Sequence, residues 1–288
     1  MTDSDLIQRF IFDQHNVRGE IVHINASFIE VLKRHLYPDH IRNILGETLT
    51  ATALLSATIK TGSLYLQIQG TGPLTLVLGQ ANARYNLRGL AKWDGEVHSE
   101  SLFEAMGSAQ LVLTFDPGAG LERYQGIIPV TRAHLASVVE DYFLQSEQIP
   151  TRLWLACGPT SAAGLLLQRM PSTGGGDDDF WHHVVHLAAT VTSQELLSLP
   201  NQELLYRLYH QENIRLFDPE PVNFRCTCSI ERMERAIRML PAEDITEMKL
   251  LPKITVTCEF CNKDYELDSI DLARIIADGF EPPSSTQH

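Results

Sequence analysis

Alternation between hydrophobic and polar residues dominates the first 171 residues of the chain. In SLYLQIQG (63–70), Leu64, Leu66 and Ile68 alternate with polar neighbours, and LTLVLGQ follows after the turn sequence GTGP, which predicts a β-hairpin. Further runs of this kind predict more strands: VRGEIVHI, YNLRGLAKW, AQLVLTF, YQGIIPV, TRLWLAC and AGLLLQRMP. Many strands joined by short turns predict a mostly antiparallel sheet.

Helical spacing of hydrophobic residues marks other parts of the same region, in ASFIEVLKRH, PDHIRNILGETLTATALLSATIK and TRAHLASVVEDYFLQSEQ. The second segment has a wide apolar face, which includes Ile41, Leu45 and Leu49 and needs a partner surface. A sheet with helices packed on one side supplies that surface. The predicted fold class is therefore α+β, with residues 1–173 as the core domain.

The sequence PSTGGGDDDFW (171–181) breaks both patterns, because consecutive glycines and aspartates do not bury apolar area. Hydrophobic residues then return at helical spacing, and Thr192 and Glu195 have the spacing of a capping box. These features predict a linker of short amphipathic helices over residues 174–224. The linker helices can dock permanently on the core domain, or pack against a C-terminal domain over residues 225–288. We expect the second arrangement.

Composition and charge argue against nucleic-acid and membrane partners. The formal net charge is −13 and no segment is basic overall, which argues against a nucleic-acid partner because phosphate binding depends on Lys and Arg. The opening MTDSDLIQRF lacks the pattern of a secretory signal, and no apolar run approaches the roughly 18 residues that span a bilayer. We expect a soluble cytoplasmic protein with no membrane partner.

The cysteines carry the most specific pattern in the chain. Four of the five form two close pairs, Cys226-Thr-Cys228 and Cys258-Glu-Phe-Cys261. Four sulfurs in two such pairs can converge on a tetrahedral ion, and all-thiolate sites favour zinc. The alternatives are a structural disulfide framework, which a reducing compartment disfavours, and unrelated buried thiols, which so close a cluster disfavours. Cys157 lies far from the others in an apolar strand and is predicted to be a buried, inert thiol.

Metal binding matters energetically because residues 225–288 carry only a modest set of hydrophobic residues. Structural zinc contributes on the order of 10–16 kcal/mol of apparent binding free energy, whereas whole domains are stable by about 5–15 kcal/mol. Loss of the metal is therefore predicted to unfold this segment. A Cys-x-Cys disulfide closes a very small loop and belongs to the labile rather than the structural bridges, so the pair suits a redox switch.

Other candidate metal or catalytic sites have less specific sequence patterns. His182, His183 and His186 in HHVVH lack the glutamate of a zinc protease and are predicted to be polar helix positions, with a second metal site as the alternative. No catalytic residues are predicted, and we expect a protein that is not an enzyme. Two other functions stay open: a thiol-disulfide oxidoreductase that uses Cys258 and Cys261, and a zinc-ribbon nucleic-acid module. ITVTCEFC alternates as a strand entering a turn, unlike an oxidoreductase helix start, and the acidic tail disfavours the nucleic-acid module.

The cysteine pattern and several longer stretches resemble the redox-regulated 33-kilodalton heat-shock chaperone family. The stretches are VRGEIV, LGETLTATALLSATIK, LQIQGTGPL, LRGLAKWDG, YQGIIPV, EDYFLQSEQIPTRLWLA, LLLQRMP, LLYRLYHQE and FRCTC with CEFC. The resemblance runs from about residue 9 to about residue 275. Where the family often has Gly after Cys-x-x-Cys, this chain has Asn262. Asn tolerates left-handed backbone angles, so the turn is expected to survive.

The resemblance implies an ATP-independent holdase that is inactive when reduced and zinc-bound. When oxidised it loses zinc, forms a homodimer and binds unfolded client proteins under oxidative stress. By motif position the zinc ligands are Cys226, Cys228, Cys258 and Cys261, and the disulfides join Cys226 to Cys228 and Cys258 to Cys261. Loss of the fold of residues 225–288 is then expected to expose a client-binding surface in the linker. That surface comprises Trp181, Val184, Leu196, Leu197, Leu204, Leu205, Leu208 and Phe217.

Overall fold

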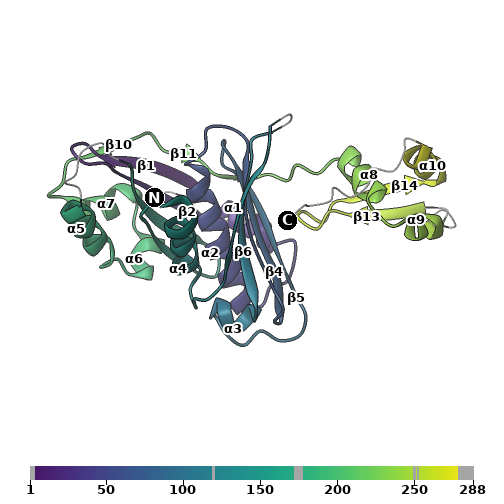
Figure 1. Ribbon diagram of the computed structural model, residues 1–288, viewed down its shortest axis with the longest axis horizontal. Helices are drawn as coiled ribbons and strands as arrows, with labels where there is room; N and C mark the ends of the chain where they lie inside the picture. The colour runs from purple at the N-terminus through teal and green to yellow at the C-terminus, as the bar shows by residue number, and fades with distance from the viewer. Residues whose placement is uncertain (1–3, 119–120, 172–177, 249–250, 252, 278–288) are drawn as a thin grey trace. The chain divides into compact units, whose positions relative to one another are not determined.

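The computed structural model describes residues 4–118, 121–171, 178–248, 251 and 253–277. The chain divides into two compact units, residues 1–225 and residues 226–288 (Figure 1). Each unit has its own hydrophobic core.

One sheet of the first unit is antiparallel throughout. Its strands are β1 (Leu6–Phe12), β2 (Val17–Ile24), β8 (Thr151–Cys157), β9 (Ala162–Arg169), β10 (Ile214–Leu216) and β11 (Glu220–Pro221). Their order is β10-β1-β2-β9-β8, and β11 also pairs with β1. The alternation predicted from the sequence places successive residues on opposite faces, and both faces of this sheet are covered.

The second sheet has the order β12-β5-β4-β3-β6-β7 and is antiparallel except for the β12–β5 pair. Its strands are β3 (Ser63–Gly70), β4 (Leu74–Asn82), β5 (Asn86–Trp93), β6 (Ala109–Asp116), β7 (Tyr124–Pro129) and β12 (Asn223–Phe224). The hairpin predicted around GTGP is the β3–β4 pair. All the strands predicted from alternation are present.

Helix α2 (Asp39–Ser56) lies between the two sheets and contacts strands of both. Two glycines allow this close approach. A Cβ at Gly79 of one sheet would lie 2.2 Å from Thr52 Oγ1, and a Cβ at Gly164 of the other would lie 2.6 Å from Thr50 Cγ2. The prediction of one sheet with helices on one side is therefore incomplete: α2 is buried on nearly every face because it has a sheet on each side.

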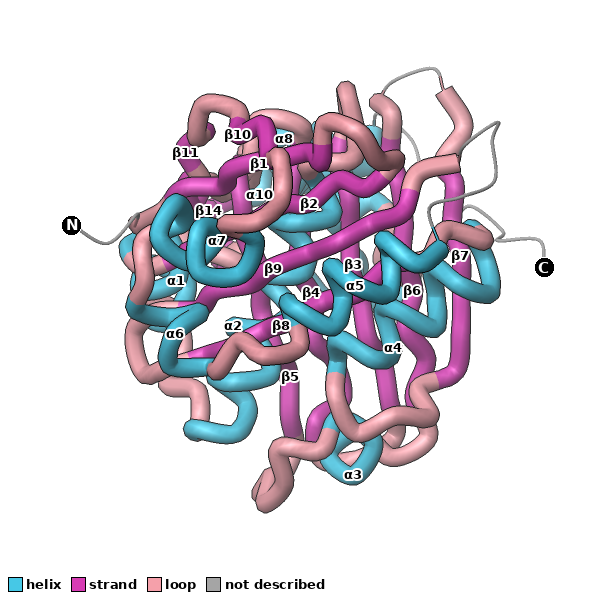
Figure 2. The backbone as a smooth tube through the Cα atoms, turned by 90° about the vertical axis from the view of Figure 1, so that its left-hand side faces the viewer, coloured by secondary structure: helices cyan, strands magenta, loops and turns pink. Residues whose placement is uncertain are grey.

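The outer face of the first sheet carries the helices that follow the GGGDDD sequence. These are α5 (Asp178–Ala188), α6 (Ser193–Ser198) and α7 (Asn201–Tyr209), which lie in front of that sheet in Figure 2. The capping box predicted at Thr192 and Glu195 is present at the start of α6. Smaller elements complete the unit: α1 (Ala26–Leu32), α3 (Leu102–Met106), α4 (Leu135–Tyr142) and a π-helical turn (Phe143–Glu147).

The second unit is small. It contains the hairpin β13 (Lys253–Thr257) and β14 (Asp264–Asp268) and the helices α8 (Ile230–Arg238), α9 (Ala242–Met248) and α10 (Ser269–Ala277). Its hydrophobic core cluster, among the described side chains, consists of Ile237, Ile245, Ile254, Leu267, Leu272 and Ile275. So small a core offers little hydrophobic stabilisation, so a bound metal would add substantially to the stability of this unit.

Candidate metal and redox site

The cysteines of the second unit come from two segments that the fold brings together. Cys226 and Cys228 lie in extended chain between β12 and α8, where Ser229 caps the helix by accepting from the backbone N–H of Arg232. Cys258 directly follows β13, and Cys261 lies in the turn that leads to β14. The pairing of Thr257 with Asp264 closes this turn.

The turn has the geometry of a metal-binding knuckle. The N–H groups of Cys261 and Asn262 donate to the carbonyl of Cys258 at 3.2 and 2.8 Å, and the N–H of Cys258 donates to the carbonyl of Lys263 at 2.9 Å. Asn262 has φ 54°, in the left-handed region that Asn tolerates better than most residues. The expectation that the turn survives with Asn262 is confirmed.

The four sulfur atoms lie within 4.8 Å of one another. The Sγ atoms of Cys226 and Cys258 are 3.7 Å apart, and those of Cys228 and Cys261 are 3.4 Å apart. A tetrahedral ion with metal–sulfur distances of about 2.3 Å needs sulfur–sulfur distances of roughly 3.8 Å. The residues therefore fit zinc. The four sequence-predicted ligands are brought together, and they form the one group of three or more possible metal ligands found in the described part of the chain.

The environment of the sulfurs favours a bound cation. Burial raises the pKa of Cys258, and it raises the pKa of Cys261 to about 12, with the neighbouring thiols adding to both effects. Backbone N–H groups of Phe260 and Cys261 oppose the shift at Cys258, and that of Lys263 opposes it at Cys261. Packed thiols thus resist ionisation on their own, whereas a dication stabilises the thiolates.

One functional contact was missed by the sequence analysis. The phenolic O–H of Tyr265 donates to Sγ of Cys228 at 3.1 Å, and Lys263 Nζ lies 4.9 Å from the centre of the Tyr265 ring. Tyr265 comes from β14, four residues beyond the Cys-x-x-Cys pair, so only the turn geometry could have indicated it. A hydrogen bond to a ligand sulfur orients that ligand and stabilises its thiolate.

Cys157 lies outside this site. It ends β8 in the first unit, where its Sγ contacts the carbonyls of Gly158 at 3.4 Å and Arg42 at 3.8 Å. Burial and the carboxylate of Glu47 raise its pKa to about 12. A thiol held protonated in this way is a poor nucleophile, in keeping with the inert role predicted for it.

The predicted client-binding residues are placed on the first sheet rather than against the C-terminal segment. The side chains of Trp181, Val184, Leu196, Leu204, Leu205 and Leu208 are buried, and Leu197 is partly buried. They pack with Phe10, Ile21 and Leu165 of the sheet. Phe217 is 39% exposed. Our expectation about their packing partner is thus corrected: the first sheet has an apolar outer face, and α5–α7 cover it.

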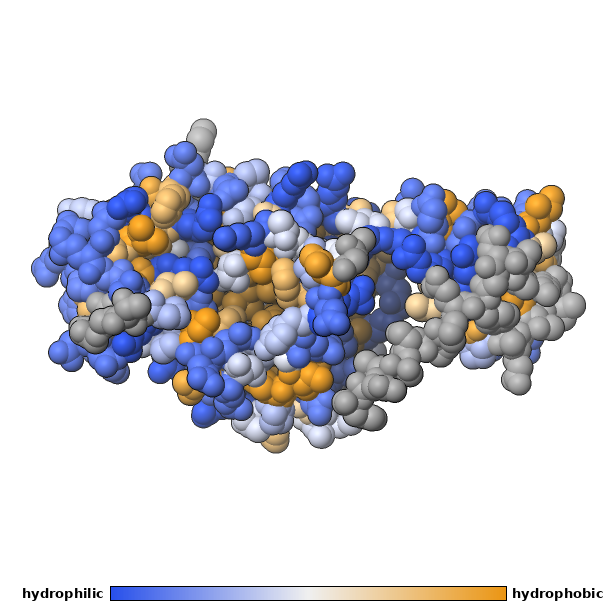
Figure 3. All heavy atoms as spheres, turned by 45° about the horizontal axis from the view of Figure 1, so that its top comes forward, coloured by the Kyte–Doolittle hydropathy of each residue, from blue (hydrophilic) through white to orange (hydrophobic). Residues whose placement is uncertain are grey.

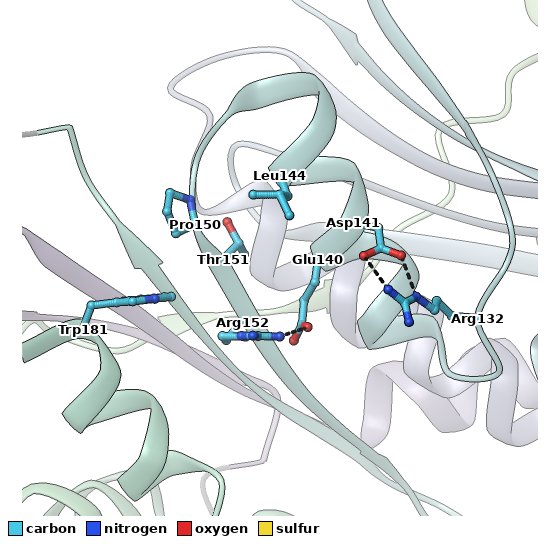
Figure 4. A pocket seen from close by; sticks show the side chains of 8 residues that line it. All are labelled: Arg132, Glu140, Asp141, Leu144, Pro150, Thr151, Arg152 and Trp181. Atoms are coloured by element: carbon cyan, nitrogen blue, oxygen red, sulfur yellow. Dashed lines mark hydrogen bonds and ion pairs between the residues drawn. The ribbon is translucent and has the colours of Figure 1, made fainter. Parts of the chain in front are cut away.

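Trp181 also lines a cavity of about 290 Å³ between α4, β8 and α5 (Figure 4). Two ion pairs cross its wall: Arg132 to Asp141 at 2.9 Å and Arg152 to Glu140 at 2.6 Å. Glu140 also accepts from the backbone N–H of Leu153, an edge residue of β8. These charged groups are paired with one another, and the contacts of Glu140 with Arg152 and Leu153 hold α4 on the sheet edge.

Two of the three histidines predicted as polar helix positions on α5 contact groups other than a metal cluster. His182 contacts the carbonyl of Asp178 at 2.7 Å through Nδ1, and His183 contacts Glu212 at 3.0 Å through Nε2. Within the residues that the structure describes, they do not join a cluster of possible metal ligands. His23, which the sequence analysis did not single out, bridges Asn201 at 3.0 Å and the carbonyl of Leu196 at 2.6 Å, and so fixes α6 and α7 on the sheet.

The surface of the molecule is mainly hydrophilic in the view of Figure 3, with apolar residues in scattered patches. In the part of the chain that the structure describes, no helix is both long and apolar enough to cross a membrane. The apolar face of α5–α7 is covered by the first sheet.

Comparisons with known proteins identify relatives of this chain. The model of a family described as "Hsp33 protein" matches residues 5–268. A protein of Nitrosococcus oceani named "33 kDa chaperonin" is 45% identical over 291 residues, which cover 100% of both chains. Its namesake from Shewanella oneidensis is 44% identical over 278 residues, or 96% of each chain. The crystal structure of the 33 kDa chaperonin from Thermotoga maritima matches with a TM-score of 0.81 at 20% identity, over 95% of this chain and 98% of that one.

Proposed function

The chain belongs to the Hsp33 family, and on this premise we propose that it is a redox-regulated, ATP-independent holdase that binds unfolding proteins under oxidative stress. The observation that carries the proposal is the convergence of four cysteine sulfurs within 4.8 Å in a unit with a small hydrophobic core. Cys226, Cys228, Cys258 and Cys261 would hold Zn²⁺, which would cross-link the segment before α8 to the turn between β13 and β14.

Oxidation removes the ligands. Two thiolates of one pair form a sulfur–sulfur bond and give up two electrons to hydrogen peroxide, which takes up two protons and leaves as two water molecules. Two such reactions convert all four cysteines into two disulfides. We propose the pairs Cys226–Cys228 and Cys258–Cys261, as in the family pattern. The shortest sulfur contacts run between the pairs, so peptide mapping of the oxidised protein decides the pairing.

Loss of the cross-link unfolds residues 226–277 and removes the folded anchor that begins one residue after Arg225. The segment between α7 and Arg225 is then no longer anchored, and α5–α7 detach more easily from the first sheet. Their apolar side chains become the client-binding surface: Trp181, Val184, Leu196, Leu197, Leu204, Leu205, Leu208 and Phe217. A newly exposed apolar face also favours a homodimer. The protein acts in the cytoplasm, without nucleic acid or membrane.

The alternative of a thiol-disulfide oxidoreductase is disfavoured by the position of Cys258. It directly follows a strand and enters a hairpin turn, whereas a reactive Cys-x-x-Cys pair starts a helix whose dipole lowers the thiol pKa. A zinc-ribbon nucleic-acid module needs a basic face, and residues 225–288 have more acidic than basic side chains.

The test follows zinc release and chaperone activity in one sample. Zinc-loaded protein is treated with peroxide at raised temperature while a chromogenic chelator reports zinc and light scattering reports the aggregation of heat-unfolding malate dehydrogenase. We expect zinc release to precede suppression of aggregation. Equal suppression by the reduced, zinc-loaded protein would rule out the switch. Insulin reduction without an effect on aggregation would favour the oxidoreductase.

A further inference from the structure

Residues 213–225, which we name the strap, close one edge of each sheet in the first unit. The strap begins after α7 and ends directly before Cys226. Its strands β10 and β11 pair with β1, and its strand β12 pairs with β5. One short segment therefore covers the edges of two sheets (Figure 1).

The strap is held largely through its backbone. Its N–H groups at Phe217 and Val222 donate to the carbonyls of Arg9 and Asp5 at 3.0 and 2.8 Å. At the other sheet, the N–H groups of Asn223 and Arg225 donate to the carbonyls of Tyr85 and Leu87 at 3.1 and 3.0 Å. Such bonds do not depend on which side chains the strap carries, so another extended chain could make them.

Side chains fix the strap at a few points. Val222 is 1% exposed and belongs to the main core, while Ile214 and Leu216 are only partly buried. Glu220 accepts from Arg9 at 3.1 Å and from Tyr85 at 3.2 Å. The seated strap thus marks an edge site for an extended segment whose apolar residues recur at alternate positions.

The strap is also the weaker partner in each pairing. Its strands have three, two and two residues, whereas β1 has seven and β5 has eight. Short pairings at a chain segment with few buried side chains open at low free energy. Once open, they leave rows of unpaired N–H and C=O groups on two long strands, which are templates for strand addition.

We propose that the edges of β1 and β5, uncovered when the strap leaves, bind extended segments of unfolding client proteins by strand addition. This rests on the proposed function, since oxidation must first release the strap. Like the strap, an unfolding client supplies free backbone groups and apolar side chains at alternate positions. Clients of unrelated sequence are then accepted, because the main chain provides most of the contacts.

A peptide of residues 213–225 tests the proposal as a competitor. It is added to the oxidised full-length protein together with heat-unfolding malate dehydrogenase, and light scattering is recorded. We expect the peptide to weaken suppression of aggregation at least fivefold. The matched control carries N-methyl groups at Phe217, Val222, Asn223 and Arg225, which removes these four donors and keeps every side chain, and we expect it to have no effect. Equal effects of the two peptides, or none from either, would overturn strand addition while leaving the holdase function intact.

Hydrogen exchange separates the remaining outcomes. In oxidised protein without client, amides of β1 and β5 are expected to lose protection relative to the reduced protein and to regain it when client is bound. Unchanged protection in the oxidised protein alone would mean that the strap stays, or that a second copy replaces it, and either result refutes the proposal. If the oxidised protein fails to suppress aggregation without any peptide, the proposed function itself fails and this inference with it.

Discussion

The hydroxyl of Tyr265 is a residue-scale test of the metal site. Tyr265→Phe removes the hydrogen bond to Cys228 and leaves the ring in place. Because partners of metal ligands typically affect affinity 10–100-fold, we expect zinc affinity to fall by about tenfold, measured by competition with a chelator. Tyr206→Phe, on the exposed face of α7, is the matched control. Equal affinities of the two variants would show that the contact does not tune the site.

Asn262 tests the turn that aims N–H groups at the sulfurs. Its left-handed φ is open to Gly and strained for a β-branched residue. We expect Asn262→Gly to keep zinc affinity and Asn262→Val to lower the stability of the zinc-loaded second unit by about 1–2 kcal/mol, read from its urea midpoint. Wild-type stability of the Val variant would mean that the turn adopts another conformation.

At this scale the sequence was informative wherever a residue acts through its neighbours in the chain. The cysteine spacing predicted the cluster, and Asn262 followed from the position after Cys-x-x-Cys. Tyr265 and His23 were beyond reach, because their partners lie 37 and 178 residues away. Contacts of that kind are determined by the packing of elements and leave no local pattern.

The contact between His23 and Asn201 tests how α6 and α7 are held on the sheet. Asn201→Ala leaves a buried histidine nitrogen without this partner, a cost of about 1–3 kcal/mol. We expect faster hydrogen exchange in α6 and α7 of the reduced protein and activation at a lower peroxide concentration. Gln202→Ala, on the exposed side of the same helix, should match the wild type. If Asn201→Ala behaves like that control, the pair does not restrain the helices.

Glu20 on β2 predicts a pH dependence for the first unit. Burial raises its pKa to about 7, although Arg18 and Arg9 lower it, and its Oε2 accepts no hydrogen bond from any described residue. The folded-state pKa of Glu20 is above its unfolded value. Its contribution to the free energy of unfolding is therefore fully present below about pH 4.5 and is lost as the pH rises through about 7.

Glu20→Gln cannot ionise, so at pH 8 it should raise the free energy of unfolding by roughly 1–3 kcal/mol, since each unit of pKa shift is about 1.4 kcal/mol. Urea titrations of wild type and variant at pH 5 and pH 8 measure this. A weaker slope is expected to remain in the variant, because burial also raises the pKa of Glu47 to about 7. Parallel slopes in the two proteins would contradict the assignment to Glu20.

Element positions were predicted well, and their partners less so. Alternation and helical spacing predicted eight strands of the two sheets and helix α2, since those patterns are local, but they did not predict β1, β10, β11 or β12. The presence of two sheets was not predicted, because period alone does not say which strands pair. The same limit explains why the linker helices were expected on the C-terminal segment: an amphipathic face shows that a helix is covered, and does not identify the cover.

At the scale of the whole molecule, the proposed switch depends on three successive interactions. In the proposed function, four thiolates hold a zinc ion, the ion stabilises the fold of the second unit, and that fold restrains the strap and the apolar helices upstream. The family and the cysteine geometry support the first link, and the small core of the second unit supports the next. The strap directly precedes the second unit in the chain, because Arg225 and Cys226 are adjacent.

Hydrogen exchange of residues 226–277 gives the most direct test, measured in one series before and after peroxide treatment alongside suppression of client aggregation. We expect protected amides in α8, β13 and β14 to become fully exchanging as zinc is released, and suppression of client aggregation to rise over the same time course. Retention of that protection in a zinc-free, disulfide-bonded and fully active protein would contradict it.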